Sequence, residues 1–422
     1  MLHIENNDVR KLLYQGCFGL EKESLRITPE GFLSHTPHPF PDDPHIVRDF
    51  CENQTEINTS VHHSAEGVVR ELSERTEQIQ KTLAELPEAE LLWPFSNPPY
   101  IRSEEDIPIA QFKGAESGNT AYRNYLSDRY GRYVMTLSGI HFNYSFSEEL
   151  LRAEFACRYD TDFANFRDQF YLELAEKAAR FGWIVTAVTA ASPVADRSFL
   201  EKGLFGGSFF TGMSSIRCSE SGYWNFFVPV FRYSDIASYA DGIQAYVDNG
   251  YLAAPRELYY PIRLKPAGKN SLSSLKGGGV NHIELRMVDL NPLEPAGINL
   301  LDVKFIQLFL IWLAAMPPRP MSEREQVYSV QNFKRAAHYD LRTVSIENLS
   351  GQSVSFADEG KNMIEAMQKF YKDAPEEVQQ ILEFERQKFI VPETRYAWIL
   401  RKEYADDFVK KGLELAKERQ VS

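Results

Sequence analysis

The feature that most constrains this chain is a set of short stretches in which polar and apolar side chains alternate. In the clearest stretch, SGIHFNYSF, the apolar positions are Ile140, Phe142, Tyr144 and Phe146, and the polar positions are His141, Asn143 and Ser145. Because alternate side chains of a strand share a face, this pattern predicts a strand with one apolar and one polar face. The apolar face needs a covering layer, and the polar face is available for a binding site.

Two further stretches place acidic residues on the polar face of a predicted strand. GLEKES puts Glu21 and Glu23 on one face, and NHIELRMVD puts His282, Glu284 and Arg286 on one face. Taken alone, each stretch has a simpler explanation. The first suits a solvated edge strand, and the second suits a structural salt bridge between Glu284 and Arg286.

A fourth stretch, RDFCENQTEIN, predicts Asp49 in a loop and Glu56 on the polar face of the strand that follows. A lone histidine such as His141 is more often structural than a metal ligand. Asp49 and Glu56, taken alone, are also only weak evidence for a metal site. Carboxylates packed together without a cation repel one another, however. If these strands are neighbours, the combined cluster therefore predicts a bound metal.

Composition restricts the classes of protein to which the chain can belong. Its 422 residues, 43% of them hydrophobic and 25% charged, are enough for one large domain or two with a well-buried core. The net charge of −13 disfavours nucleic acid or an anionic membrane surface as the main partner. The most apolar helical segment, Phe305–Met316, is too short for a bilayer, which needs about 20 residues.

The amino terminus and the cysteines bear on the cellular compartment. The first residues, MLHIENNDVRK, lack the apolar segment of a signal peptide. Cys17, Cys51, Cys157 and Cys218 show no CxxC or paired spacing, which is typical of reduced thiols. We therefore expect a cytoplasmic protein.

The order of the predicted elements favours an α+β fold with an antiparallel sheet. Strands are predicted mainly before residue 290, and helices from Asp302 to the end of the chain apart from Pro-rich breaks. Other helices are predicted over 64–86, 121–130 and 161–181, and a strand over 133–146. Asn249–Gly250 predicts a hairpin turn, and Lys276–Gly279 a flexible approach to the last strand.

Common nucleotide-binding and hydrolase motifs are absent from the sequence. There is no GxxxxGKS/T, no GxGxxG after a strand, no GxSxG and no HExxH. A bound nucleotide would therefore need metal ions and arginines to hold its phosphates.

Taken together and in this order, the motifs resemble the bacterial glutamate–cysteine ligase (γ-glutamylcysteine synthetase) family over about residues 16–320. The resemblance is carried by GLEKESLRI, DFCENQTEIN, LLWPFSNPPYI, IPIAQF, YRNYLSDRYG, LSGIHFNYSF, ELYYPIRLK and GGGVNHIELRMVDLNP. The spacings agree as well as the residue types. The likeness is closest to the short form, including the ligase module at the front of bifunctional glutathione-synthesising enzymes.

The resemblance implies a glutamine-synthetase-like fold, in which a curved, mostly antiparallel sheet forms a funnel and helices cover its convex side. It also implies a catalytic domain over residues 1–320, with a helical C-terminal region over residues 321–422 packed on it.

The resemblance further implies roles for the polar residues of the predicted strands. The family's metal ligands correspond to Glu21, Glu23, Asp49, Glu56, His141 and Glu284. Arg286 corresponds to the arginine that contacts the transferred phosphate, so Arg286 and Glu284 are the expected catalytic residues.

Other matched positions imply the substrate and nucleotide contacts. Tyr122, Tyr223 and Tyr259 correspond to the pocket for the amine substrate, and Arg217, Arg263 and Lys265 to anion or phosphate contacts. Cys51 and Asn53 depart from the small or apolar residues usual in the family, which bears on the shape of the pocket.

The implied reaction joins the γ-carboxylate of L-glutamate to the amine of L-cysteine through γ-glutamyl phosphate, with ATP converted to ADP and phosphate. This is the first step of glutathione biosynthesis. The expected cofactor is Mg²⁺, with Mn²⁺ as the alternative, and ATP is the co-substrate. The expected partners are these small molecules, not nucleic acid or a membrane, and the oligomeric state is left open.

Three alternatives remain open from the residues alone. The first is the same activation chemistry with another acceptor amine. The second is a non-catalytic binding paralogue, and the third is a metal-dependent phosphohydrolase. Only the phosphohydrolase would cleave ATP without both amino acids.

Overall fold

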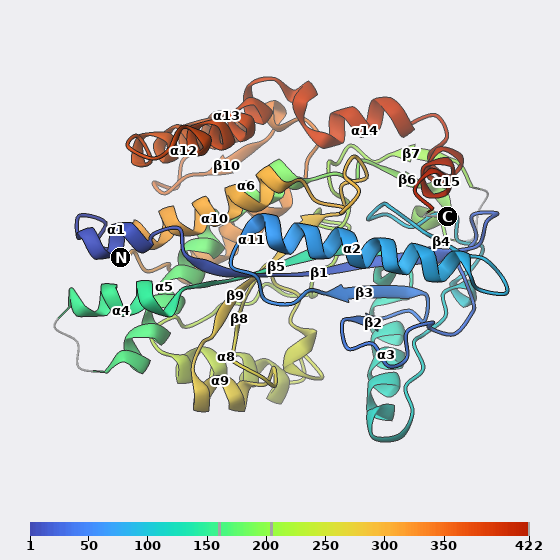
Figure 1. Ribbon diagram of the computed structural model, residues 1–422, viewed down its shortest axis with the longest axis horizontal. Coiled ribbons are helices and arrows are strands. Elements are labelled where there is room, and N and C mark those ends of the chain that lie inside the picture. Colours follow the sequence, from blue (N-terminus) through green and yellow to red (C-terminus); the bar gives the residue numbers. More distant parts are fainter. Residues whose placement is uncertain (159–161, 203–205, 421–422) are drawn as a thin grey trace.

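A seven-stranded sheet forms the centre of the computed structural model, which describes residues 1–158, 162–202 and 206–420 (Figure 1). Its strands are β1 (Gly16–Ile27), β2 (Ile46–Arg48), β3 (Gln54–Asn58), β4 (Leu91–Leu92), β5 (Gly139–Phe146), β8 (Ile262–Lys265) and β9 (His282–Asp289). Their order is β2–β3–β1–β5–β9–β8, with β4 also paired to β1. Every pair is antiparallel, so the predicted α+β fold with an antiparallel sheet is confirmed.

The register of β1 with its two neighbours brings the predicted polar faces together. Glu21 on β1 pairs with His141 on β5, and Glu23 pairs with Glu56 on β3. On the other edge of β5, its next polar residue pairs with Glu284 of β9. We call the face that carries these residues the front face, and the opposite, apolar face the back face.

An irregularity in β9 lies directly across from His141. Ile140 pairs with Val288 and Phe142 pairs with Leu285, so β9 has one more residue than β5 between these pairs. This is a β-bulge, and bulges often re-aim side chains next to functional sites. Here the bulge falls at the Arg286 position, beside the acidic front face.

Helices cover the back face of the sheet. These helices are α2 (Ala65–Ala84), α5 (Phe163–Phe181), α6 (Trp183–Thr189) and α10 (Leu300–Ala315). They bury back-face side chains such as Phe142 and Leu285. α10 is apolar on almost every side, as expected for a helix in the interior of a large domain. Neither α10 nor any other described helix is long and apolar enough to cross a membrane.

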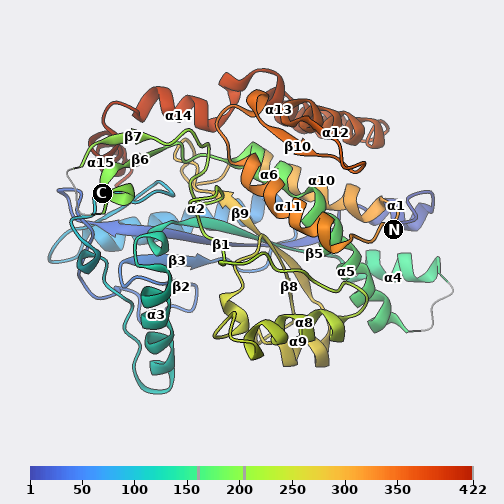
Figure 2. The ribbon, with the colours of Figure 1, turned by 180° about the vertical axis from the view of Figure 1, so that it is seen from behind.

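The remaining elements lie around this centre. They are the helices α1 (Asn7–Leu12), α3 (Ser117–Tyr130), α4 (Glu148–Ala156), α7 (Arg197–Leu200), α8 (Ile236–Asp248), α9 (Leu272–Gly278), α11 (Glu323–Ala336), α12 (Phe356–Phe370), α13 (Glu376–Ile390), α14 (Tyr396–Tyr404) and α15 (Phe408–Glu418), and the strand pairs β6 (Val194–Asp196) with β7 (Ser208–Phe210) and β10 (Ser345–Glu347) with β11 (Ser353–Ser355). Figures 1 and 2 show α8 and α9 on one side of the molecule and α12–α14 on the other. α3 projects from the body beside β2 and β3.

Two predicted helices begin at side chains that cap them. Ser64 accepts a hydrogen bond from the backbone N–H of Gly67 at the start of α2, and Asp162 accepts from Ala164 and Asn165 at the start of α5. Residue 161, where the second prediction starts, lies outside the described residues. The helix predicted over 121–130 is α3, which begins four residues earlier than expected, at Ser117.

The predicted hairpin turn at Asn249–Gly250 is wrong. This dipeptide instead ends α8, a helix that was not predicted. Gly250 has φ +76°, and such a left-handed residue follows the last turn of many helices, because it closes the helix as readily as it closes a hairpin.

Three other predictions need correction at element boundaries. The chain is not helical throughout from Asp302, since β10 and β11 form a hairpin whose turn contains Gly351 at φ +72°. The strand predicted over 133–146 begins only at Gly139, after a short 3-10 turn. The Lys276–Gly279 segment is not a flexible approach, because it completes α9 up to Gly279.

A buried ion cluster ties the C-terminal helices to the central layers. The Nζ of Lys388 on α13 lies 2.9 Å from Oδ1 of Asp302 on α10 and 2.8 Å from Oε2 of Glu385. It also donates to the carbonyl oxygen of Val188, 3.0 Å away. All three charged side chains are buried, so each depends on the others to replace lost hydration.

Replacing Lys388 with Met should lower the free energy of unfolding by about 3–5 kcal/mol, because two carboxylates would stay buried without their cation. Urea denaturation followed by circular dichroism measures the change. Lys402→Met, at an exposed position of α14, is the control and should change stability by no more than about 0.5 kcal/mol. Equal effects of the two substitutions would contradict the stabilising role given to Lys388.

Candidate active site

The front face forms the floor of a cleft with a volume of about 240 Å³. All but one of the predicted site residues line it: Glu21, Glu23, Asp49, Glu56, Tyr122, His141, Arg217, Tyr223, Tyr259, Lys265, Glu284 and Arg286. They come from β1, β3, β5, β8, β9, α3 and the loops between them. The structure therefore brings together residues that lie up to 265 positions apart in the chain, counted from Glu21 to Arg286.

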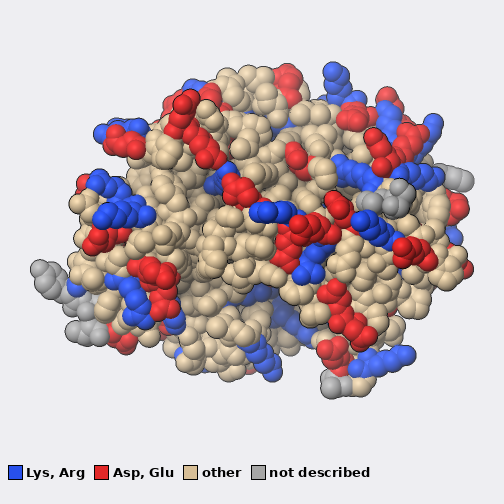
Figure 3. All heavy atoms as spheres, in the orientation of Figure 1, with Lys and Arg blue, Asp and Glu red and all other residues tan. Residues whose placement is uncertain are grey.

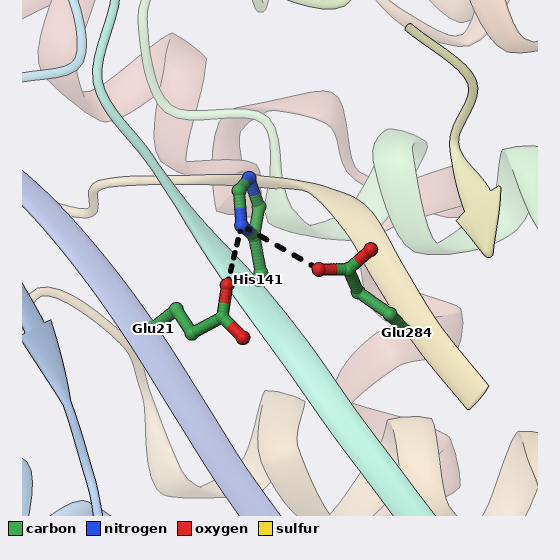
Figure 4. Close-up of side chains that lie close together, drawn as sticks. All are labelled: Glu21, His141 and Glu284. Atoms are coloured by element: carbon green, nitrogen blue, oxygen red, sulfur yellow. Dashed lines mark hydrogen bonds and ion pairs between the residues drawn. The ribbon is translucent and has the colours of Figure 1, made fainter. Parts of the chain in front are cut away.

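Three of these residues form the closest group of potential metal ligands. Glu21, His141 and Glu284 each offer a ligand atom, and these atoms all lie within 4.8 Å of one another. His141 Nδ1 is 3.0 Å from Glu21 Oε2 and 3.9 Å from Glu284 Oε1. Figure 4 shows the imidazole of His141 between the two carboxylates, with one residue supplied by each of three neighbouring strands.

Glu284 is fully buried and stays ionised because cations surround it. Its Oε1 lies 3.1 Å from both Lys265 Nζ and Arg286 Nη1. Burial alone would raise the pKa of Glu284, but Arg286, Lys265 and Arg263 outweigh burial and hold it well below the usual value. The second carboxylate oxygen, Oε2, is buried and has no hydrogen-bond partner among the described residues.

The opposite situation holds for three other carboxylates of the cleft, Glu23, Asp49 and Glu56, which lie close enough to repel one another. Burial and the nearby Asp49 raise the pKa of Glu23 to about 8, and burial with Asp49 and Glu21 raises that of Glu56 well above its usual value. Within the part of the chain that the structure describes, the backbone N–H of Gly139 donates to Glu23 Oε2 at 3.0 Å. Arg217 and Arg286 act in the opposite direction on Glu23 but do not outweigh burial and the charge of Asp49.

His141 is suited to coordinate a cation. Burial, followed by the positive charge of Arg286, lowers the pKa of His141 to about 4. Its imidazole is therefore neutral near pH 7 and has a lone pair available. Burial alone would raise the pKa of Glu21. The hydrogen bond that its carboxylate accepts from His141 outweighs burial, together with nearby positive charge, and the pKa is lowered.

The donor set fits a hard divalent cation. Carboxylate oxygens with one histidine nitrogen are ligands that Mg²⁺ and Mn²⁺ accept. The unpartnered Oε2 of Glu284 and the raised pKa values of Glu23 and Glu56 both indicate a site that a positive ion would complete.

Cations also line the cleft, although the chain as a whole is acidic. They are Arg123, Arg217, Arg256, Lys265 and Arg286. On the face of the molecule in Figure 3, Lys and Arg are interspersed with Asp and Glu, without an extended basic surface. The cleft therefore contains five cationic side chains beside its five carboxylates, and these cations can attract an anionic substrate despite the net charge of −13.

Arg217 reaches the cleft because a glycine leaves room for it. A Cβ on Gly139, the first residue of β5, would overlap the Arg217 guanidinium. Arg217 Nη1 also donates to the carbonyl oxygen of Val288, 3.4 Å away. The guanidinium therefore lies flat against the sheet at the edge of the front face.

A side cavity of about 50 Å³ adjoins the cleft. Four residues line both spaces: Arg217, Tyr223, Tyr259 and Arg286. Thr186 lines the side cavity but not the cleft. The hydroxyl of Thr186 is buried and has no hydrogen-bond partner among the described residues. The side cavity thus offers an unused polar group next to an arginine.

The three predicted tyrosines form one wall of the cleft. The rings of Tyr223 and Tyr259 contact each other edge to face, with centroids 4.3 Å apart. Tyr122 lies under the guanidinium of Arg256, whose Cζ is 3.7 Å from the ring centroid. Aromatic rings, a cation and the apolar Leu126 therefore enclose this end of the cleft.

Arg263 is the predicted site residue that does not line the cleft. Its guanidinium donates to the carbonyl oxygens of Leu258 and Arg256 instead. The two departures, Cys51 and Asn53, are fully buried and do not line the cleft either. Cys51 and Asn53 therefore affect its shape only through neighbours such as Phe50.

Sequence reasoning missed five residues that line the cleft: Phe50, Arg123, Leu126, Leu137 and Arg256. Phe50 and Arg123 directly follow Asp49 and Tyr122, so adjacency was an available signal. Leu126 lies one helical turn beyond Tyr122 on α3 and could have been found by helical spacing. No pattern in the sequence indicated Arg256.

Comparisons with known proteins support the resemblance. The family model described as glutamate–cysteine ligase matches residues 1–226 and 226–336. The chain is 36% identical over 409 residues to the glutathione biosynthesis bifunctional protein of Listeria monocytogenes, covering 93% of this chain and 53% of that protein. It is 31% identical over 388 residues to the glutamate–cysteine ligase of Clostridium acetobutylicum, covering 80% of each.

A solved structure shows the same fold. The crystal structure of a bifunctional glutathione synthetase from Pasteurella multocida superimposes with a TM-score of 0.84 at 28% identity, covering 99% of this chain and 54% of that one. The chain thus spans about half the length of the bifunctional proteins it matches.

Replacing Glu284 with Gln should weaken Mn²⁺ binding at least about tenfold, or ~1.4 kcal/mol, because it removes a buried charge from the ligand group. Electron paramagnetic resonance of free Mn²⁺ measures the affinity. The matched control is Glu52→Gln, whose carboxylate lies near Asp49 in sequence but binds Arg48 outside the cleft. Unchanged affinity in the Glu284 variant would show that the cation binds elsewhere.

Proposed function

The chain belongs to the glutamate–cysteine ligase family, and we propose that it joins the γ-carboxylate of L-glutamate to the amine of L-cysteine. ATP is converted to ADP and phosphate in the same cycle, and the product, γ-glutamylcysteine, is the first intermediate of glutathione biosynthesis. The observation that carries the proposal is the convergence of all six candidate metal ligands with Arg286 in one cleft.

The proposed reaction has two steps, since a carboxylate is a poor electrophile. First, a γ-carboxylate oxygen of glutamate attacks the γ-phosphorus of ATP, and ADP leaves. The resulting γ-glutamyl phosphate is then attacked at its acyl carbon by the amine of cysteine, which loses a proton while phosphate leaves. Neither step needs a nucleophile from the protein, so positioning and electrostatics account for catalysis.

We assign the cofactor as Mg²⁺, held by Glu21, Glu23, Asp49, Glu56, His141 and Glu284. When bound, it would offset the negative charge of the ATP phosphates.

Arg286 is proposed to stabilise charge on the transferred phosphoryl group. Its guanidinium lies at the bulge of β9 and donates to Glu284 Oε1 at 3.1 Å, so this carboxylate helps to fix its orientation. A planar guanidinium can donate two parallel hydrogen bonds to phosphoryl oxygens. Lys265 lies on the other side of Glu284 and is proposed to contribute a second positive charge.

Arg217 is proposed to bind the α-carboxylate of glutamate. It lines both the cleft and the side cavity, next to the unpartnered hydroxyl of Thr186. A glutamate held there by its α-carboxylate could extend its γ-carboxylate toward Arg286, which borders the same cavity.

The acceptor amine is proposed to bind beside Tyr122, Tyr223 and Tyr259. These rings, with Leu126, enclose a small space that suits a short side chain. We further propose that residues 1–320 carry the catalytic machinery and that residues 321–422 support it from the far side of the back-face helices.

Replacing Arg286 with Lys should lower kcat at least ~10-fold, about 1.4 kcal/mol of transition-state stabilisation, because an ammonium cannot reproduce the planar guanidinium. Phosphate release at saturating substrates measures kcat. Thermal unfolding and the KM for ATP serve as controls, since a purely structural role would change stability instead. A wild-type kcat would refute the phosphoryl contact.

A panel of acceptor amines tests the proposed reaction itself. ATP turnover should require glutamate and an amine together, with cysteine fastest and 2-aminobutyrate about 10–200-fold less efficient, because one small group in a pocket contributes only about 1–3 kcal/mol. Product masses identify each ligated amine. ATP cleavage without amino acids would indicate a phosphohydrolase, faster ligation of a bulky or cationic amine would overturn the acceptor assignment, and no turnover would favour a binding paralogue.

A further inference from the structure

A cysteine and a histidine, Cys17 and His63, lie close together near the first residue of β1, away from the cleft. Phe18 and His62 form an antiparallel β-bridge, with hydrogen bonds of 2.7 Å and 2.9 Å between their backbone groups. In such a bridge the residue before one partner lies beside the residue after the other. Cys17 is thereby placed next to His63, and Cys17 Sγ lies 3.5 Å from His63 Nδ1.

The segment that carries His63 is fixed on both sides. The imidazole of His62 contacts Glu71 Oε2 on α2, and the same oxygen accepts a hydrogen bond from the backbone N–H of Ser60 at 2.9 Å. The N-cap residue of α2, Ser64, follows directly after His63. The approach of the histidine to the thiol therefore follows from the backbone and does not depend on a flexible loop.

The thiol of Cys17 is accessible from solvent. Cys17 is half-buried and His63 is exposed, and both line a surface cavity of about 590 Å³. Cys17 lies on the same face of β1 as Glu21 but four residues away, which corresponds to roughly 13 Å along a strand. The two sites share no lining residue, so the cavity is separate from the cleft.

The other three cysteines differ from Cys17 in their surroundings. Cys51 and Cys218 are buried, and Cys157 donates to the carbonyl oxygen of Ala153 at 3.3 Å. Burial raises the pKa of each of these three thiols. Among the four cysteines, only Cys17 has a histidine nitrogen within hydrogen-bond distance of its sulfur.

We propose that Cys17 and His63 form a thiol-modification site that reacts with low-molecular-weight disulfides. His63 accepts the thiol proton, and the Cys17 thiolate attacks one sulfur of the disulfide. A new S–S bond joins Cys17 to half of the reagent as the original S–S bond breaks, and the other half leaves as a thiolate that takes up a proton. No further oxidant is needed, because one S–S bond forms for the one that breaks.

The expected contribution of His63 is modest. The thiolate is the attacking species, so a base 3.5 Å from the thiol that accepts its proton favours the reaction. A thiolate stabilised by a neighbouring group is also a weaker nucleophile, which offsets part of this advantage.

The test uses the full chain and the uncharged reagent bis(2-hydroxyethyl) disulfide, which excludes charge steering by neighbouring side chains. Mass spectrometry of the intact protein and of its peptides should show one fast adduct at Cys17 that is reversed by dithiothreitol. Cys17→Ser should abolish the fast phase. His63→Gln should slow it at least about threefold at pH 7, whereas His338→Gln, a histidine bound to Glu220 elsewhere on the surface, should not change it.

Two results would overturn the proposal. One is a fast adduct at Cys157, the other partly exposed cysteine, in place of Cys17. The other is an equal rate of Cys17 modification in the wild type and the His63→Gln variant, which would show that the histidine does not activate the thiol. Because the readout is adduct mass and not turnover, the outcome is independent of the proposed ligase reaction.

Discussion

The positions of the charged side chains that β1, β3 and β5 contribute to the cleft depend on the antiparallel register of β1 with its two neighbours. That register sets Glu21 beside His141 and Glu23 beside Glu56. A slip of one residue would turn both β1 carboxylates to the back face, among the rings of the apolar core, at a large cost in desolvation. In the observed register Lys22 points to the back, where it donates to Thr76 at 3.1 Å.

Electrostatics divides the cleft into two unlike halves. Around Glu284, cations outnumber carboxylates and keep the acid ionised. At Glu23 and Glu56, burial and the neighbouring Asp49 raise the pKa of both carboxyls. A cleft built in this way can take up positive charge at one end and anionic groups at the other, which is what a reaction between a nucleotide and a carboxylate requires.

The alternation of polar and apolar residues was sufficient to predict β1, β5 and β9 and the face on which each acid lies. It could not predict local choices decided by tertiary contacts. Asn249–Gly250 suits a helix end as well as a hairpin, and only the packing of α8 decides between them. Arg263 shares the front face of β8 with Lys265, yet its long side chain turns to nearby carbonyl oxygens. Arg256 lies in a short 3-10 helix, Pro255–Glu257, that has no amphipathic pattern, so its approach to Tyr122 is visible only in three dimensions.

The absence of a side chain at residue 139 has a practical consequence. Gly139 has an ordinary strand conformation, so an alanine there would not strain the backbone, and the atoms it would displace belong to the flexible end of Arg217. A single methyl group at this position would thus displace the Arg217 guanidinium from its place beside β5, while the strand keeps its conformation. Such a variant would change the position of the Arg217 guanidinium without changing the charge of the chain.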